Sequence, residues 1–178
     1  RLRTAIRRIN LNEHGQEWLD DVTIDRAIRQ LLQVEGHGLL EQNRHFTERL
    51  IKGERVSVAD QDENDTTREI RIHFIAWDHV ERNEFMAINQ FRVDLRGSRH
   101  FKIPDLVLFV NGLPLVIVEC KSPGITDPMN EAVDQLLHYS DQRKLDYGEQ
   151  EGIPELFQFN QLLIGTHFYE AKASTLGD

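Results

Sequence analysis

Two uninterrupted apolar runs dominate the hydrophobic pattern, residues 106–110 (LVLFV) and 113–118 (LPLVIV), with only Asn111-Gly112 between them. An Asn-Gly pair between β-branched runs is the strongest short-range signal for a β-hairpin. Because neither run alternates with polar residues, we expect both faces of these strands to be covered, as in the middle of a sheet flanked by helices.

The rest of the chain alternates predicted helices and strands. Apolar residues spaced three to four apart predict helices over residues 12–33, 40–51 and 129–143, the first capped by Asp20, Asp21 or Thr23. Alternating or short apolar patterns predict strands over residues 69–77, 86–93 and 161–165. The polar segments 59–68 and 141–156 are predicted to be loops, and the chain after Tyr169 a short strand or extended segment.

Three charged residues stand at the ends of the hairpin strands: Asp105 before the first run, and Glu119 and Lys121 after the second. Charges are rarely buried unless they are paired, and residues two apart on a strand share a face. A regular two-residue loop would place Asp105 opposite Val118, on the wrong face. We therefore predict an odd-length loop or a β-bulge, with Gly112 in a left-handed conformation, which brings Asp105 beside Glu119. A regular hairpin with the two carboxylates on opposite faces would contradict a shared site.

Two converging carboxylates repel unless a proton or a cation lies between them. Hard oxygen ligands suit Mg²⁺ or Mn²⁺, with Asp105, Glu119 and the backbone carbonyl of Cys120 as candidate ligands. Lys121 on the same face could position or activate a water molecule beside the metal while charge develops on a phosphate. The pattern indicates a phosphodiester-hydrolysing site. The Cys120 side chain is predicted to be a small buried residue without a catalytic role.

Pro104-Asp105 followed by Glu119-Cys120-Lys121 resembles the PD-(D/E)xK signature of metal-dependent nucleases. Residues 104–123 resemble more closely the nuclease segment of the R (restriction) subunit of type I restriction–modification enzymes, and residues 39–53 and 83–91 resemble earlier segments of that family. Gln135 and Tyr139 fit the Gln-x-x-x-Tyr element of the RecB-like branch of these nucleases. The resemblance runs from about Leu19 to the end of the chain.

This resemblance implies an α/β, restriction-endonuclease-like fold, with a central mixed β-sheet of four or five strands flanked by helices, formed by residues 1–178 as one domain. It implies that Gln135 and Tyr139 support the site or contact DNA, although a helix with a Tyr at its polar boundary would show the same spacing. It also implies a further acid on the first helix, for which Asp25 is the candidate, with Glu35 and Glu41 behind it.

The net charge of −9 argues against strong binding of duplex DNA by this chain alone, because phosphate contacts need Lys and Arg. A basic cluster that includes Arg99 and Lys102 could contact phosphates near Asp105, or could be a solvated connection. The chain has no P-loop motif, no long apolar span and one cysteine, so we expect a cytoplasmic nuclease domain of a larger subunit. The resemblance implies duplex DNA, methyltransferase and specificity subunits as partners, and ATP through motor domains outside this chain.

Two alternatives remain from the sequence. One is a related nuclease, such as a repair exonuclease or a junction resolvase, which we would expect to be more basic. The other is a non-catalytic docking module of the same fold, although such a module has no reason to keep three costly charges at the edge of a core.

Overall fold

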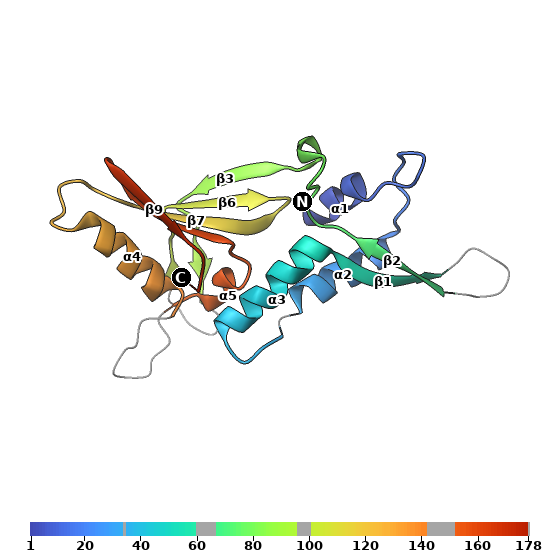
Figure 1. Ribbon diagram of the computed structural model, residues 1–178, viewed down its shortest axis with the longest axis horizontal. Helices are drawn as coiled ribbons and strands as arrows, with labels where there is room; N and C mark the ends of the chain where they lie inside the picture. The colour runs from blue at the N-terminus through green and yellow to red at the C-terminus, as the bar shows by residue number, and fades with distance from the viewer. Residues whose placement is uncertain (34, 60–66, 96–100, 142–151, 178) are drawn as a thin grey trace.

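A computed structural model gives the fold and describes residues 1–33, 35–59, 67–95, 101–141 and 152–177 (Figure 1). In chain order the elements are α1 (Leu2–Ile9), α2 (Asp21–Leu32), α3 (Leu39–Lys52), β1 (Glu54–Ala59), β2 (Thr67–Ile72), the 3-10 turn η1 (Val80–Arg82), β3 (Phe85–Asn89), β4 (Val93–Asp94), β5 (Phe101–Lys102), β6 (Leu106–Val110), β7 (Leu113–Lys121), α4 (Pro128–Tyr139), α5 (Pro154–Phe157), β8 (Leu162–His167) and β9 (Glu170–Ser174). None of the helices in these ranges is long and apolar enough to cross a membrane.

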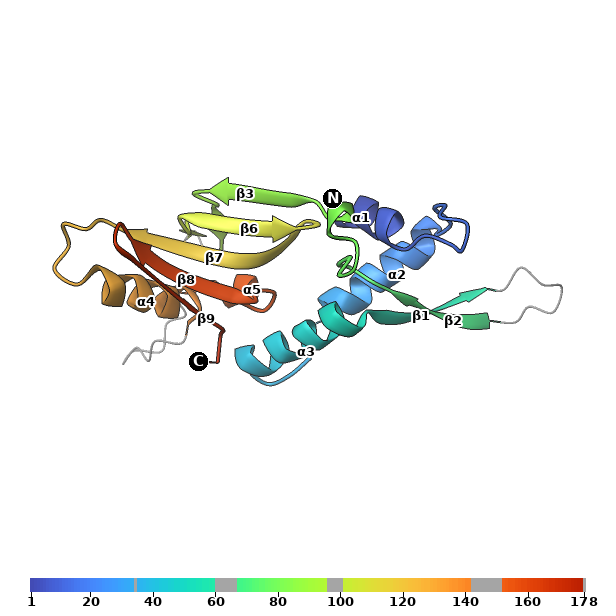
Figure 2. The same cartoon turned by 45° about the horizontal axis from the view of Figure 1, so that its top comes forward.

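The central sheet has five strands in the order β3-β6-β7-β8-β9. All neighbours are antiparallel except β7 and β8, which are parallel and are connected through α4. The predicted α/β class with a mixed sheet and flanking helices is therefore confirmed. The sheet with α4 occupies one end of an elongated molecule, and the β1–β2 ribbon projects from the other end (Figures 1 and 2).

The hairpin of β6 and β7 combines a tight turn with a β-bulge. Val110 pairs with Leu113 across Asn111-Gly112, so the loop itself has two residues, with positive φ angles of 55° and 86°. The register then shifts, because Phe109 pairs with Pro114 but Leu108 pairs with Val116. The predicted bulge and the left-handed Gly112 are confirmed, and the bulge leaves one extra residue, Leu115, on β7.

Replacing Gly112 with alanine is expected to lower the free energy of unfolding by about 1–2 kcal/mol, because a left-handed conformation is strained for residues with a Cβ atom. The added Cβ would also lie 3.1 Å from Cβ of Arg1. Gly124→Ala is the matched control, since its Cβ would meet only Oγ of Ser122 at 3.7 Å. Chemical denaturation checks this, and equal stability of the two variants would contradict a strained turn at Gly112.

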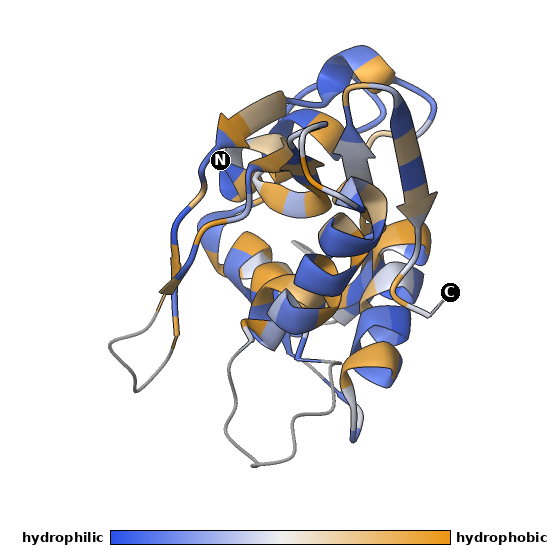
Figure 3. Ribbon diagram, turned by 90° about the vertical axis from the view of Figure 1, so that its left-hand side faces the viewer, coloured by the Kyte–Doolittle hydropathy of each residue, from blue (hydrophilic) through white to orange (hydrophobic). Residues whose placement is uncertain are grey.

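The two faces of the sheet are covered unequally. Burial along β6 alternates, with Val107 and Phe109 buried and the residues between them half-buried. The buried side joins Ile117 and Leu136 in a cluster beneath α4 and α5, whereas the opposite side is covered mainly near the hairpin turn, where Val110 packs on the N-terminal core. The expected cover of both faces is therefore found on the α4 side and only in part on the other side. Figure 3 shows hydrophobic and hydrophilic residues interleaved along the strands and helices, as expected where an element has one buried and one exposed side.

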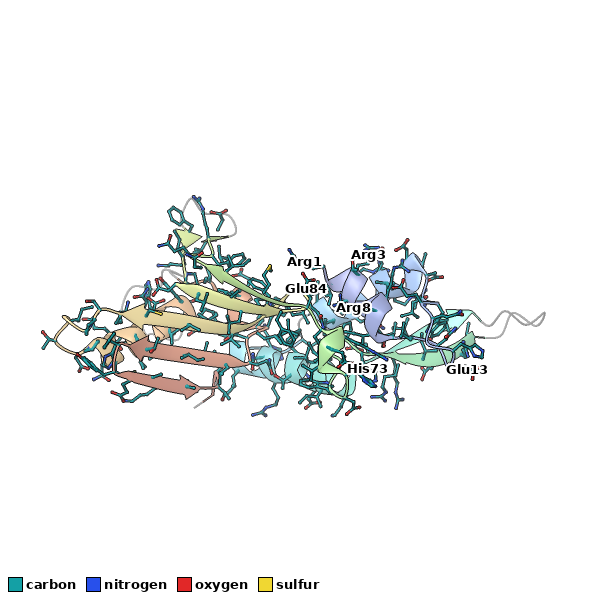
Figure 4. All side chains as sticks on the ribbon, turned by 90° about the horizontal axis from the view of Figure 1, so that it is seen from above. Arg1, Arg3, Arg8, Glu13, His73 and Glu84 are labelled. Carbon is teal, nitrogen blue, oxygen red and sulfur yellow. The ribbon has the colours of Figure 1, made fainter. Side chains whose placement is uncertain are left out.

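The buried turn residue Asn111 joins the sheet to the N-terminal half. Its side chain donates to the carbonyl of Phe74 and accepts from the backbone N–H of Glu84, both at 2.8 Å. The Glu84 carboxylate pairs with Arg1 before α1, and Arg8 of α1 lies beside the same junction (Figure 4). These contacts fix the turn end of the β6–β7 hairpin against the N-terminal half, so its other end, which carries the charged residues, has a defined position.

Several predicted boundaries differ from the structure. The helix predicted over residues 12–33 begins only at Asp21, where the Asp20 side chain caps it by accepting from the N–H of Thr23 at 2.7 Å. The predicted strand 69–77 ends at Ile72, and residues 128–139 form α4, which is shorter than predicted. Helix α1, strand β1 and the short helix α5 were not predicted, and the strand at 161–165 is found as β8. Most of the predicted loops 59–68 and 141–156 lies outside the described residues.

Candidate functional site

The bulge places Asp105 and Glu119 across from each other. Leu106 pairs with Val118, so the same register carried one step further sets Asp105 opposite Glu119. The Asp105 backbone is held by the N–H of Gln90, which donates to its carbonyl at 2.8 Å. Its Oδ2 accepts from the backbone N–H of Cys120, also at 2.8 Å. One extra residue in β7 therefore turns two carboxylates that would lie on opposite faces into neighbours.

Glu119 is a buried acid, and only one of its two carboxylate oxygens has a hydrogen-bond partner among the described residues. Its residue is 2% exposed, and Oε1 accepts from Nζ of Lys121 at 3.0 Å. Oε2 is buried and has no hydrogen-bond partner among the described residues. Burial raises the pKa of this carboxyl to about 6, against the opposing effect of the Lys121 hydrogen bond and with a further rise from the Asp105 charge. An unpartnered buried carboxylate oxygen next to a second carboxylate is the arrangement that a cation would stabilise.

Lys121 begins a chain of hydrogen bonds that leads into α4. Its side chain is only 14% exposed, and Nζ also donates to Oε1 of Gln135. Nε2 of Gln135 donates to the Tyr139 hydroxyl at 2.6 Å. Burial raises the pKa of Tyr139, so the phenol stays protonated at neutral pH. Because Gln135 and Tyr139 are one helical turn apart and both face the sheet, α4 fixes the position of the Lys121 ammonium group.

The candidate ligands are suited to a hard divalent cation. The described residues contain no group of three or more His, Cys, Asp or Glu side chains arranged to hold a metal ion. Asp105 and Glu119 would therefore supply two carboxylates, and the remaining positions would be filled by the Cys120 carbonyl, water and substrate oxygens. Mg²⁺ is commonly bound in this way, through one or two carboxylates with several waters and phosphate oxygens.

The Cys120 side chain is exposed, so the prediction that it is buried is wrong. Side chains alternate along a strand, and because Glu119 and Lys121 face α4, Cys120 faces the less covered side of the sheet. Desolvation, followed by the charges of Asp105 and Glu119, raises the pKa of its thiol. The group is therefore a thiol rather than a nucleophilic thiolate at neutral pH.

Lys102 lies in an open groove of about 600 Å³ beside the site, lined by Phe101, Ile103 and the α4 residues Glu131, Asp134, Gln135, His138 and Tyr139. Its Nζ is 2.8 Å from Nε2 of His138. This places a basic side chain beside the end of the Lys121 hydrogen-bond chain, whereas contact with phosphate stays a prediction. Arg99 lies outside the described residues.

The structure does not bring the proposed first-helix acid to the site. Helix α2 packs against α1, α3 and β1, and Asp25 pairs there with Arg3 of α1 at 2.5 Å. Glu35 pairs with Arg49 at 2.9 Å, and Glu41 accepts from the backbone N–H of His37. Each of these three acids therefore has a local structural partner in the N-terminal half of the chain.

His167 is a site neighbour that sequence reasoning missed. It lies directly opposite Lys121 in the parallel pairing of β7 and β8, and residues opposite each other in a parallel pair project from the same face. Its Nδ1 is buried without a hydrogen-bond partner in the described part of the chain. No local signal could identify it, since only the pairing of two strands more than 40 residues apart brings it to Lys121.

Comparison with known proteins identifies the family. Residues 1–177 match the family described as type I restriction enzyme R protein N terminus. The chain belongs to this family. The match includes α1, whereas the resemblance found in the sequence alone began at about Leu19.

Relatives from three bacteria agree with this family assignment. The type I restriction enzyme HindI endonuclease subunit of Haemophilus influenzae is 29% identical over 98% of this chain and 15% of its own length. The SsaAORF53P endonuclease subunit of Staphylococcus saprophyticus is 31% identical over 86% of this chain, and the SauCOLORF180P subunit of Staphylococcus aureus is 28% identical over 91%. The chain spans about 15% of the length of these R-subunit relatives. It corresponds to their N-terminal domain.

Proposed function

We propose that this R-subunit N-terminal domain is a metal-dependent DNA endonuclease that hydrolyses phosphodiester bonds. The observation that carries the proposal is the register across the bulge, which sets Asp105 opposite the buried Glu119 and leaves Oε2 of Glu119 without a partner. The names of the relatives, which are endonuclease subunits, support the same reaction class.

Asp105 and Glu119 would hold Mg²⁺ or Mn²⁺, with the Cys120 carbonyl as a further ligand. When bound, the cation offsets the charge of the carboxylates and stabilises negative charge on a phosphate. The pKa of the buried Glu119 would be lower beside the cation, because a nearby positive charge stabilises the carboxylate form that burial disfavours.

Lys121 would orient the attacking water and stabilise charge on the scissile phosphate. Its ammonium group is held from two sides, by Oε1 of Glu119 at 3.0 Å and by Oε1 of Gln135. Tyr139 holds the Gln135 amide so that its oxygen faces Lys121. A charged group that is fixed before substrate binds needs no reorganisation in the transition state, which is the usual source of electrostatic catalysis.

The partners of this domain follow from its charge and its relatives. A domain with a net charge of −9 is a poor binder of duplex DNA, so we infer that other modules hold the DNA. We propose that these are ATP-driven motor domains of the same subunit, together with methyltransferase and specificity subunits, and that cleavage follows translocation of unmodified DNA. Sequence recognition would then belong to another subunit.

The test is calorimetric titration of Mg²⁺ and Mn²⁺ into this chain and into Asp105→Asn. We expect the wild type to bind the cation and the variant to lose at least tenfold in affinity, since one of two carboxylate ligands becomes neutral. Asp127→Asn is the control, because that carboxylate caps α4 and lies outside the site. Equal binding by wild type and Asp105→Asn would place the cation elsewhere and contradict the proposed centre.

A further inference from the structure

The turn between β8 and β9 carries two aromatic side chains that are almost fully exposed. His167 pairs with Glu170, so Phe168 and Tyr169 are the two residues of the loop. They are 81% and 80% exposed, the highest values among the large hydrophobic residues that the structure describes. Two adjacent exposed aromatic side chains lower solubility and add little to folding stability, which indicates a binding role.

The two aromatic residues also depart from the chemistry of such turns. Two-residue hairpin loops favour Asn and Gly, because the turns that match strand twist need positive φ angles. The β6–β7 turn follows this rule with Asn111-Gly112, whereas neither Phe168 nor Tyr169 is among the described residues with positive φ. Local rules of this kind are broken mostly at functional sites.

The two rings pack against each other, and one of them packs against the His167 ring. The Phe168 and Tyr169 rings meet edge to face at 5.0 Å and 83°, and Tyr169 meets the His167 ring at 6.2 Å. The turn beneath them is tied by Oγ1 of Thr166, which donates to the carbonyl of Glu170 at 3.0 Å. A short, tied hairpin presents these rings with little conformational freedom left to lose on binding.

The position of the turn connects it to the candidate site. His167 lies opposite Lys121, the last residue of β7, so the aromatic pair begins one strand spacing, about 4.8 Å, from the Lys121 backbone and one residue further along. The turn stands at the end of the sheet where β7 leads toward α4 (Figure 2). The grooves of B-form DNA are about 6 Å and 12 Å wide. The turn therefore lies within a groove width of the Lys121 backbone, close enough to be contacted by DNA that has a phosphate at Asp105 and Glu119.

We propose that Phe168 and Tyr169 contact the bases of the DNA bound at the site, as an apolar wedge against the base stack next to the scissile phosphate. The inference rests on the proposed nuclease function. Phosphates are bound by basic groups, whereas aromatic rings stack on bases or insert between them, whatever the sequence. Contacts that tolerate any sequence suit a domain whose DNA site is chosen by other modules.

The first test uses the intrinsic fluorescence of Phe168→Trp, measured against the unsubstituted protein to remove the background of Trp18 and Trp77. Short duplex and single-stranded oligonucleotides are added in Ca²⁺ at low salt. We expect the introduced indole to be quenched by stacking on bases, with the duplex and single-strand arms showing which form is contacted. Phe85→Trp is the matched control, because Phe85 is also exposed but lies on β3, at the opposite edge of the sheet. The titration is carried to oligonucleotide concentrations at which the fluorescence anisotropy of a labelled oligonucleotide shows that the complex has formed. In that complex, equal responses of the two variants, or no response of either, would overturn the proposal.

The second test compares cleavage by Phe168→Ala/Tyr169→Ala, Phe85→Ala and wild type in the assembled enzyme. We expect the double variant to lose about tenfold or more in kcat/KM, chiefly through KM, as loss of base stacking predicts. Unchanged kinetics with an active wild type would overturn the wedge and leave the nuclease function intact, whereas an inactive wild type would contradict the function itself. Sedimentation that shows a wild-type dimer lost in the double variant would assign the turn to a protein contact and overturn the DNA wedge.

Discussion

Replacing Lys121 with alanine is expected to lower the single-turnover rate constant of DNA cleavage by about 10²–10⁴-fold, which is the usual range for loss of one preorganised electrostatic or proton-transfer group. Metal binding at Asp105 and Glu119 should persist, because Lys121 is not a ligand. The measurement is single-turnover cleavage in the assembled enzyme at saturating Mg²⁺. Lys172→Ala provides a control, since Lys172 is an exposed lysine on β9.

The same substitution has a stability effect that separates catalysis from folding. Glu119 is buried, and removing the partner of a mostly buried charge destabilises a protein by about 3–5 kcal/mol. This cost should be largest in metal-free protein at pH 8 and should shrink near pH 5, where Glu119 takes up a proton, and in Mg²⁺. Thermal denaturation in Mg²⁺ verifies that Lys121→Ala is folded. A folded variant that still cleaves DNA at the wild-type rate would contradict the proposed role of Lys121.

The core of the site could be predicted because its determinants are local. The Asn111-Gly112 turn fixes where the hairpin reverses, and simple counting shows that a regular hairpin would separate Asp105 from Glu119. For the costly charges to share a face, either an odd-length loop or a bulge was then required, and the structure has the bulge, at Leu115. The spacing of Gln135 and Tyr139 gave their common helix face, but their contact with Lys121 rests on how α4 packs over β7 and β8.

Features that depend on contacts between distant segments could not be predicted. The partner of Asp25 is Arg3 of α1, an element that the sequence pattern did not indicate, so the sequence offered no alternative to the metal-facing role that the family resemblance implied. His167 reaches Lys121 only through parallel pairing of β7 with β8. The buried role of Asn111, which bonds to Phe74 and Glu84, likewise needs the junction between the two halves of the molecule.

The metal-free protein is expected to lose stability as the pH rises through about 6, and Glu119→Gln should remove this loss. Folding raises the pKa of Glu119 from 4.5 to about 6, so the folded state holds this proton more tightly than the unfolded state. The contribution is complete below about pH 4.5 and is lost as the pH rises through the folded-state value. A rise of about 1.5 units corresponds to roughly 2 kcal/mol.

Denaturation of wild type and Glu119→Gln at pH 5 and pH 8 measures this effect as a difference of differences. The variant should gain about 2 kcal/mol relative to wild type between the two conditions, because a neutral amide pays no desolvation penalty at high pH. Glu155→Gln, at an exposed position, controls for the loss of one negative charge. Mg²⁺ at about 100 times its Kd should restore roughly 2.7 kcal/mol to wild type at pH 8 but little to Glu119→Gln. Equal pH dependence of the two proteins would show that burial does not raise the pKa of Glu119. The argument for a cation at its unpartnered oxygen would then fail as well.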